Sequence, residues 1–551
     1  MKIILIGLFL LSGFGQANQS LLEVRIGEKS LTVLKNPCFK PVALMENSII
    51  VETEESGIEN LRNIDIDFKV LLDPTSLKRA KEQNLSFYLV TPPFERKSES
   101  ARIFLEQNGR VLTEDNYSYL FLTSPDFAER LPILRYEIAH VSLKGIVLSE
   151  DDIGKPSLQE TAWHQPNLNP IIDSIINQIT PTEVAQLVRE LSGEVPVLVW
   201  GRLDTILTRY ATAPKNSDAI WFCYENLSSF AGLDTIEFHP FTWQGDRNDS
   251  NVIATKVGTV YPGRYWIIGG HIDCTSENPT VYAPGADDNA TGTAAMMIAA
   301  KYLSPLYFKN TIRFIAWNTE EFGLYGSEAH ALEARSRNDT ILGVLNGDMI
   351  GTEFTNNDSI RIYTGPRTSS RAIGDTFFNV NADYGIGLNI RRSSYMPSYS
   401  DHYSYYTQDF DAVCIIEDDN CPYYHTTGDR ITASSFDTLF FCKVVKNMVA
   451  TLATFAEIDT IGPGIGGDVA ERSFKNLVIK PNPTRGLATV FYNLPKQETA
   501  TLKIYDVLGD LVHSEKSDKG LFRIEKLPAG IYVLRFEANG YKENRKLAVV
   551  K

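Results

Sequence analysis

Cysteine is scarce in this 551-residue sequence, and its spacing does not indicate a metal site. The six cysteines are Cys38, Cys223, Cys274, Cys414, Cys421 and Cys442. So few cysteines exclude a small fold that depends on disulfide bonds, and none of them form the C-x-x-C pair that is typical of structural zinc sites. Cys414 and Cys421 are close enough along the chain to form a local disulfide.

Positive charge is also in short supply. Lys and Arg number 53 against 68 Asp and Glu, which gives a net charge of -15. Binding to nucleic acid requires a clustered excess of basic side chains that neutralise phosphates. The composition therefore predicts an acidic protein with no nucleic-acid partner.

Long apolar runs are missing except at the start of the sequence. Lys2 precedes an apolar run from Ile3 to Leu11, and Gly15-Gln16-Ala17 supplies small residues for cleavage. This order is typical of a secretory signal peptide, residues 1–17. The run is too short to cross a hydrocarbon core of roughly 30 Å, so it does not indicate a membrane anchor. We expect a secreted protein, extracellular or at the cell surface, with no stable membrane span.

The remaining chain has the composition of several globular domains, with 43% hydrophobic and 22% charged residues. In residues 18–160, Ser48-Ile49-Ile50-Val51 and Ser118-Tyr119-Leu120-Phe121 mark a pattern that is repeated. The repeat predicts two strand-helix-strand units in a small α+β domain. Because this domain has no cluster of histidines or paired carboxylates, we expect it to act as a propeptide, chaperone or inhibitor.

The sequence predicts that residues 165–458 form an α/β domain with a mostly parallel sheet covered by helices. Buried strands are indicated by continuous apolar runs without alternation, which are Tyr265–Gly269, Ile312–Trp317, Leu342–Leu345 and Ala412–Ile416. Helical spacing is found in Ile171–Leu191 and Asn289–Leu303. Strands that alternate with helices are typical of this architecture.

The last part of the chain is predicted to be a separate all-β domain. Residues 459–470 are rich in glycine and read as a linker. Residues 471–551 contain short strand-like runs separated by turn residues. This pattern predicts a β-sandwich with a sorting or accessory role.

Metal-binding side chains follow three of the predicted central strands. His271 follows the run that ends at Gly269, Glu320 and Glu321 follow Trp317, and Asp348 follows Leu345. Ligands of open α/β sheets bind beyond the carboxyl ends of the strands, so these side chains should converge.

Two further residues complete the candidate site. Asp287 lies in a loop that leads into a helix, and His425 follows the fourth strand. Two imidazoles, three ligating carboxylates and one free carboxylate suit a hydrolytic site with two zinc ions, in which one carboxylate bridges ions about 3.5–4 Å apart.

The motifs around these residues resemble those of the dizinc peptidase family that includes bacterial leucine aminopeptidases and, more distantly, glutamate carboxypeptidases. They are G-G-H-I-D, P-G-A-D-D-N-A-T-G, N-T-E-E-F-G, N-G-D-M and H-T-T-G-D, in the family's order. The resemblance implies that Asp287 bridges two zinc ions, with Glu321 and His425 on one and His271 and Asp348 on the other. It leaves Glu320 free to act as general base.

Two finer features of the site follow. Asp273 stands two residues after His271, where its carboxylate can accept the proton of the second imidazole nitrogen and fix the tautomer. The resemblance also implies a cis peptide bond between Asp287 and Asp288. His402 is expected beside the substrate pocket rather than on the metal, near Tyr395, Met396 and Tyr399.

The C-terminal domain resembles the sorting domains of proteins exported by type nine secretion. The resemblance rests on motifs such as Pro481-Asn482-Pro483-Thr484 and Leu527-Pro528-Ala529-Gly530. It implies contact between residues 471–551 and a secretion machinery. A generic adhesion or accessory module is the alternative.

The sequence therefore predicts a secreted metallo-exopeptidase that acts on peptide substrates, with an aminopeptidase favoured over a carboxypeptidase. A glutaminyl cyclase with one zinc is a second hypothesis, but such a site would not need both His271 and Asp348. A peptidase-like protein that only binds a partner is a third. Such proteins typically lose ligands or the base, whereas here all the expected positions are filled.

Overall fold

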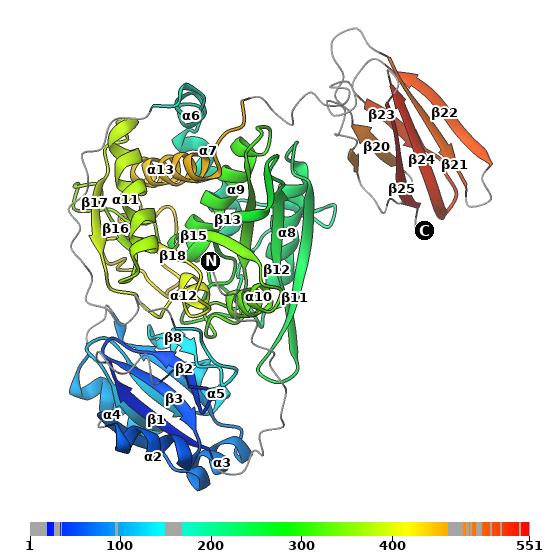
Figure 1. Ribbon diagram of the computed structural model, residues 1–551. Helices are drawn as coiled ribbons and strands as arrows, with labels where there is room; N and C mark the ends of the chain where they lie inside the picture. The colour runs from blue at the N-terminus through cyan, green and yellow to red at the C-terminus, as the bar shows by residue number, and fades with distance from the viewer. Residues whose placement is uncertain are drawn as a thin grey trace, which may run out of the picture.

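The computed structural model describes residues 19–26, 34, 36–64, 66–93, 97–148, 168–460, 478–480, 484, 487–491, 499–506, 510–517, 521–538 and 541–549. Within them the chain forms an N-terminal body, a central body around a large sheet, and a C-terminal β-sandwich (Figure 1). The expected signal peptide and most of the expected linker, residues 459–470, lie outside the described residues.

The N-terminal body consists of two sheets with the same topology. Its strands are β1 (Ser20–Arg25), β2 (Phe39–Leu44), β3 (Ser48–Thr53), β4 (Phe68–Leu72), β5 (Ser86–Thr91), β6 (Arg110–Glu114), β7 (Tyr119–Thr123) and β8 (Glu137–His140). The antiparallel sheets have the orders β2-β3-β1-β4 and β6-β7-β5-β8. The two repeated segments fall on β3 and β7, which hold equivalent places. Each unit has four strands, so the expected strand-helix-strand unit was too small.

Short helices cover these two sheets. They are α2 (Glu55–Asn63), α3 (Pro74–Glu82), α4 (Glu99–Asn108), α5 (Pro125–Ala128) and the 3-10 turn η2 (Pro132–Leu134). Ser98 and Ser124 begin α4 and α5 by accepting main-chain N–H bonds with their side chains, as N-caps do. One apolar core joins both sheets and extends to Leu324 and Tyr403 of the central body.

The central body is built on an eight-stranded mixed sheet with a parallel centre. Its strands are β11 (Thr235–Trp243), β12 (Arg247–Lys256), β13 (Tyr261–His271), β14 (Asn310–Trp317), β15 (Thr340–Gly347), β16 (Ser359–Tyr363), β17 (Asn389–Ser393) and β18 (Ala412–Glu417). The order is β11-β12-β14-β13-β15-β18-β16-β17. The four predicted strands are the adjacent parallel strands β14, β13, β15 and β18, which confirms that prediction. A small hairpin, β9 (Val197–Val199) and β10 (Arg202–Asp204), lies outside this sheet.

Helices pack on both faces of the large sheet. They are α6 (Pro170–Ile176), α7 (Pro181–Leu191), α8 (Asn216–Ser229), α9 (Thr291–Leu303), α10 (Tyr325–Ser336), α11 (Thr368–Asp383), α12 (His402–Tyr406) and α13 (Thr438–Ala456). One apolar core contains residues of α6 to α9, α11 and α13, and another contains residues of α10 and α12. The single helix predicted over Ile171–Leu191 is wrong, because Thr180 caps a new helix whose first residue is Pro181.

Helix α13 is, by length and composition, apolar enough to cross a membrane, which the sequence analysis overlooked. In the structure 72% of its apolar stretch is buried, and it packs against α7, α9 and α11. These contacts are those of a core helix.

The C-terminal body is a β-sandwich, as predicted. Its strands are β19 (Val478–Lys480), β20 (Leu487–Phe491), β21 (Ala500–Tyr505), β22 (Leu511–Ser517), β23 (Leu521–Glu525), β24 (Gly530–Ala538) and β25 (Tyr541–Val549). They form sheets of order β19-β20-β23 and β22-β21-β24-β25, which share one apolar core.

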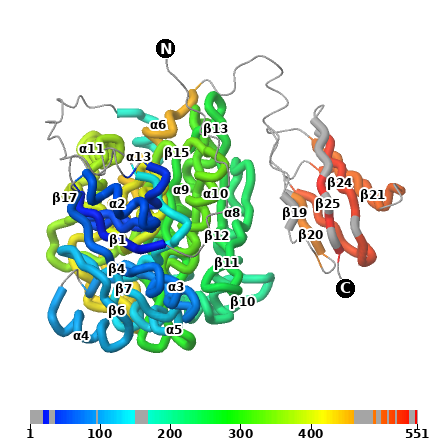
Figure 2. The backbone as a smooth tube through the Cα atoms, turned by 60° about the horizontal axis from the view of Figure 1, so that its bottom comes forward, coloured from blue at the N-terminus to red at the C-terminus, as the bar shows by residue number. Residues whose placement is uncertain are grey.

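The N-terminal body docks at the end of the large sheet where β13 and β14 finish. Figure 2 brings this body to the front, against the central body. The main-chain N–H of His140 donates to the Gly323 carbonyl at 3.1 Å, and the Tyr403 hydroxyl donates to the Leu44 carbonyl at 3.0 Å. The rings of Tyr117 and Tyr395 lie 4.1 Å apart. The N-terminal and central bodies are therefore joined by hydrogen bonds and an aromatic contact as well as by their shared apolar core.

Candidate metal centre and active site

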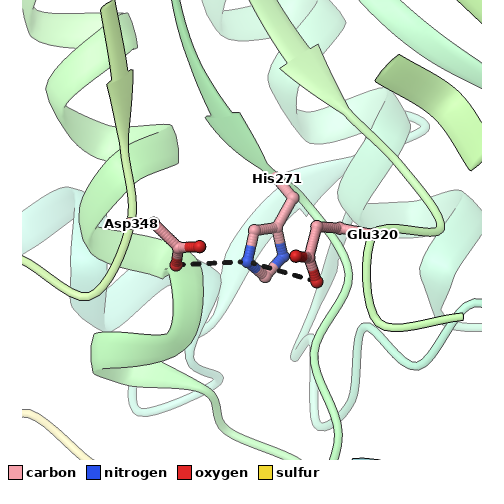
Figure 3. Close-up of side chains that lie close together, drawn as sticks. All are labelled: His271, Glu320 and Asp348. Carbon is pink, nitrogen blue, oxygen red and sulfur yellow. Dashed lines mark ion pairs between the residues drawn. The ribbon is translucent and has the colours of Figure 1, made fainter. Parts of the chain in front are cut away.

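The carboxyl ends of three neighbouring parallel strands deliver the first side chains of the site. His271 is the last residue of β13, Glu320 follows β14, and Asp348 is the first residue after β15. In Figure 3 His271 lies between Glu320 and Asp348. Its Nε2 is 3.4 Å from Asp348 Oδ1 and 3.9 Å from Glu320 Oε2.

Close contact between the backbones of β13 and α9 makes this geometry possible. A Cβ added to Gly270 would lie 2.5 Å from the main-chain carbon of Gly292. A Cβ added to Gly292 would lie 2.0 Å from the carbonyl oxygen of Gly347, at the end of β15. Only glycine fits at either position, so the motifs G-G-H and A-T-G bring the loop before α9 against the strand ends.

A second group of side chains lies directly beside the first. His425 Nε2 is 3.0 Å from Glu321 Oε2 and 3.0 Å from Asp288 Oδ2. The other oxygen of Asp288, Oδ1, is 3.2 Å from Nε2 of His271. One carboxylate thus presents one oxygen to each imidazole, and the site consists of two three-residue groups.

The residue between the imidazoles is Asp288, where the sequence analysis placed Asp287. The Asp287 carboxylate instead accepts the main-chain N–H of Gly351 at 2.9 Å and the Thr352 hydroxyl at 2.6 Å. It is therefore turned away from both histidines. The expected cis peptide bond is also displaced by one residue, because it joins Asp288 and Asn289.

Asp287 belongs to a different buried acidic cluster with Glu417 and Cys421. Burial raises the pKa of Asp287, and burial together with the neighbouring Asp287 raises that of Glu417 well above its usual range. Two buried carboxyl groups in contact favour one shared proton. The pair can therefore remain buried without a cation.

Both histidines are oriented by main-chain carbonyl groups. His271 Nδ1 is 3.0 Å from the carbonyl oxygen of Asp273, and His425 Nδ1 is 2.5 Å from that of Pro132. A carbonyl oxygen only accepts hydrogen bonds, so the proton must be on Nδ1 in each ring. Each Nε2 is then free to bind a metal ion.

Asp273 acts on the site differently from what was expected. Its carboxylate Oδ1 lies 3.7 Å from His271 Nδ1, so the carbonyl of Asp273 and not its side chain accepts the hydrogen bond from the imidazole N–H. The two carboxylate oxygens accept the main-chain N–H groups of Glu320 at 3.0 Å and Glu321 at 3.2 Å. Asp273 thus holds the main chain of the two adjacent glutamates in place.

Burial and mutual repulsion perturb the acids of the site. Burial raises the pKa of Glu321 to about 7 despite the opposing effect of His425, and raises that of Glu320 well above its usual range. Burial would lower the pKa of His425, but Glu321 and Asp288 outweigh it and raise this pKa well above its usual value. Such shifts mark a charge imbalance that is typical of functional sites.

The donor set fits two divalent cations. Four carboxylates face two imidazoles, so even two protonated histidines would leave negative charge uncompensated. In the described part of the chain, Glu321 Oε1 and Asp348 Oδ1 are buried without a hydrogen-bond partner. Oxygen and imidazole nitrogen are ligands that zinc accepts.

Sequence reasoning missed two residues that hold the loop before Asp288. The guanidinium of the fully buried Arg209 donates to the carbonyls of Ile272, Leu191, Pro284 and Gly285 at 2.6–2.8 Å. Asp429 accepts the main-chain N–H groups of Asp287 at 2.9 Å and Asp288 at 3.0 Å. Asp429 is the last residue of the H-T-T-G-D motif, so the sequence offered a reason to consider it. Arg209 lies outside all the motifs named, so no sequence pattern indicated its role.

The remaining expectations concern His402 and the cysteines. His402 is buried and lies outside both groups of the centre, and its place beside the substrate pocket stays a prediction. All six cysteines are free thiols, so the local bridge considered for Cys414 and Cys421 is absent.

Comparison with known sequences agrees with this geometry. Residues 251–449 match Peptidase family M28, and residues 478–550 match the secretion system C-terminal sorting domain. The match to the peptidase family thus falls within the central body, and the match to the sorting domain falls within the C-terminal body. The motifs that position the strand-end ligands and the loop of Asp288 all lie within the matched range.

Named relatives match only part of the chain. A probable zinc metalloprotease of Pyrenophora tritici-repentis is 38% identical over 211 residues, which are 35% of this chain and 43% of that protein. A probable leucine aminopeptidase 2 of Aspergillus oryzae is 34% identical over 138 residues, or 24% of this chain and 26% of that protein. The chain therefore spans less than half the length of these relatives.

Two solved structures share the fold. The LapA aminopeptidase of Legionella pneumophila has a TM-score of 0.51 and 19% identity, covering 68% of this chain and 98% of that one. LapB of Legionella pneumophila has a TM-score of 0.52 and 17% identity, covering 68% and 99%.

Proposed function

We propose that this protein is a secreted zinc aminopeptidase with two metal ions. The observation that carries the proposal is the carboxylate of Asp288, which directs one oxygen to His271 and the other to His425. A carboxylate in this position would be able to hold two cations at once. Glu321 and His425 would complete one site, and His271 and Asp348 the other.

The residues of the chain have distinct tasks in this proposal. Bound zinc supplies Lewis acidity, which polarises the scissile carbonyl and eases deprotonation of water. Glu320 acts as general base, takes a proton from the attacking water and returns it to the leaving amine. Asp273 holds the main chain of Glu320 and Glu321, so that one side chain binds metal while the other faces substrate.

Separate observations support the end of the peptide that is attacked and the export of the enzyme. Attack at the amino terminus is favoured because a relative is named a leucine aminopeptidase. Export is supported by the signal-like residues 1–17 and the sorting domain, which would contact a secretion machinery. A one-zinc cyclase is disfavoured because both three-residue groups are present.

Substitution of the adjacent glutamates tests the assignment. Glu320→Gln should retain two zinc ions and lose about 100- to 10,000-fold in kcat, since general-base catalysis contributes about that much. Glu321→Gln is the matched variant and should lose zinc as well as activity. Zinc content and hydrolysis of leucine p-nitroanilide measure both effects. Full activity of Glu320→Gln would eliminate Glu320 as the base.

A further inference from the structure

A pocket of about 210 Å³ lies between the N-terminal and central bodies. Its walls include Pro92, Pro93 and Glu137 from the N-terminal body and Met349, Tyr399 and Tyr424 from the central body. Met349 and Tyr424 are sequence neighbours of Asp348 and His425, so the pocket adjoins the metal centre. A substrate residue placed there would contact both bodies.

Most acidic side chains of this pocket already have partners. Asp418 pairs with Arg361 and with Arg391, the latter at 2.7 Å. Glu417 accepts the N–H of Thr352 at 2.8 Å. Asp419 is also satisfied, because it accepts main-chain N–H groups from the loop before β16.

Glu137 is different from these acids. Its Oε1 accepts a hydrogen bond from the Tyr424 hydroxyl. Among the described residues lining the pocket, Glu137 is the carboxylate that holds neither a cation nor a main-chain donor. It is the first residue of β8, and its register opposite Thr91 of β5 fixes it on the pocket wall.

An ionised carboxylate at this half-buried position is destabilising unless it is paired with a cation. The Glu137 side chain is half-buried in the pocket wall, and its hydrogen-bond partner there is the neutral hydroxyl of Tyr424. A positively charged group in the pocket would supply the missing partner. A peptide with a free amino terminus, or with a lysine side chain, brings such a group.

We infer that Glu137 binds the ammonium group of the substrate, so that the N-terminal body supplies part of the active site. The inference rests on the proposed function. It also implies that this body remains with the mature enzyme, because Glu137 and the Pro132 carbonyl both act on the centre from the same segment. A propeptide that must be removed would not contribute either group.

The test uses Glu137→Gln in the full chain. With two zinc ions retained, KM for leucine p-nitroanilide should rise about 10- to 100-fold with little change in kcat, because a charge-assisted hydrogen bond is lost. Binding of L-leucinamide, measured by calorimetry, should weaken by the same factor. Glu129→Gln is the matched control, since Glu129 also joins the two bodies, through Arg247 at 2.6 Å, but lies outside the pocket.

Two substrates separate the sources of the ammonium group. An equal loss with leucine and lysine p-nitroanilides assigns Glu137 to the α-ammonium, and a loss confined to lysine assigns it to the side chain. Unchanged KM and leucinamide affinity, or loss of zinc from Glu137→Gln, would overturn the inference. If the zinc-loaded wild type hydrolyses neither anilide, the proposed function fails, and leucinamide binding still decides the role of Glu137.

Discussion

His425 Nδ1 donates a hydrogen bond of 2.5 Å to the main-chain carbonyl of Pro132, which lies 293 positions earlier in the sequence. Pro132 belongs to the short turn η2 of the N-terminal body. The bond fixes the imidazole tautomer and turns Nε2 toward Asp288 and Glu321. A residue that we assign to a metal is thus held by a different domain.

Displacing the Pro132 carbonyl should weaken zinc binding. A glycine inserted between Leu131 and Pro132 shifts the carbonyl away from His425, and loss of such an outer partner typically lowers metal affinity about 10- to 100-fold. Competition with a chromophoric chelator measures the affinity, and circular dichroism checks the fold. A glycine inserted between Gly245 and Asp246, in an open turn, is the control and should have no effect. Equal zinc affinity in both variants would contradict the role of Pro132.

The two adjacent aspartates before α9 should respond differently to the same substitution. Asp288→Asn weakens the proposed bridge and should reduce bound zinc below two ions per chain, with loss of activity. Asp287→Asn should keep two zinc ions, because the Asp287 carboxylate contacts Gly351 and Thr352 rather than the histidines.

Metal analysis of the two purified variants decides between the assignments. Thermal unfolding shows whether each is folded, so that loss of zinc is not confused with loss of structure. If Asp287→Asn loses zinc and Asp288→Asn keeps it, the bridge belongs to Asp287, as the sequence pattern first indicated.

The central fold was predictable because strands that are buried on both faces appear in the sequence as continuous apolar runs. Strands β13, β14, β15 and β18 each contain a continuous buried apolar run, and β13 and β15 have parallel neighbours on both edges. Strands β11 and β17 are largely exposed or half-buried, so their composition does not separate them from loops. The boundary between α6 and α7 was missed although Pro181 marks it.

The candidate site was predictable to within one residue. Asp287 and Asp288 have the same side chain and adjacent places in one motif, so nothing local distinguishes them. Their roles are set by distant segments: Thr352 engages Asp287, and His425 engages Asp288. Pro132 acts through its main-chain carbonyl, a group that every residue has. Its role therefore cannot be predicted from the sequence.

Removal of zinc should make stability depend on pH. Without metal, burial raises the pKa of Glu320 and Glu321, the latter to about 7, so the folded state holds more protons than the unfolded state above about pH 4.3. Stability of the zinc-free protein should therefore fall as pH rises toward 7. The lowered pKa of Asp288, where the histidines outweigh burial, acts in the opposite sense only at more acidic pH.

Bound zinc should remove this fall, because the cations take over the charge balance that protons provide in the zinc-free protein. Calorimetric Tm values at pH 5 and pH 8, with and without a chelator, measure the effect. We expect the Tm difference between loaded and zinc-free protein to be larger at pH 8, where metal binding no longer competes with protons for the same carboxylates and imidazoles. A difference that is equal at both pH values would show that these acids do not titrate with the metal, and would remove the electrostatic basis for a two-cation centre.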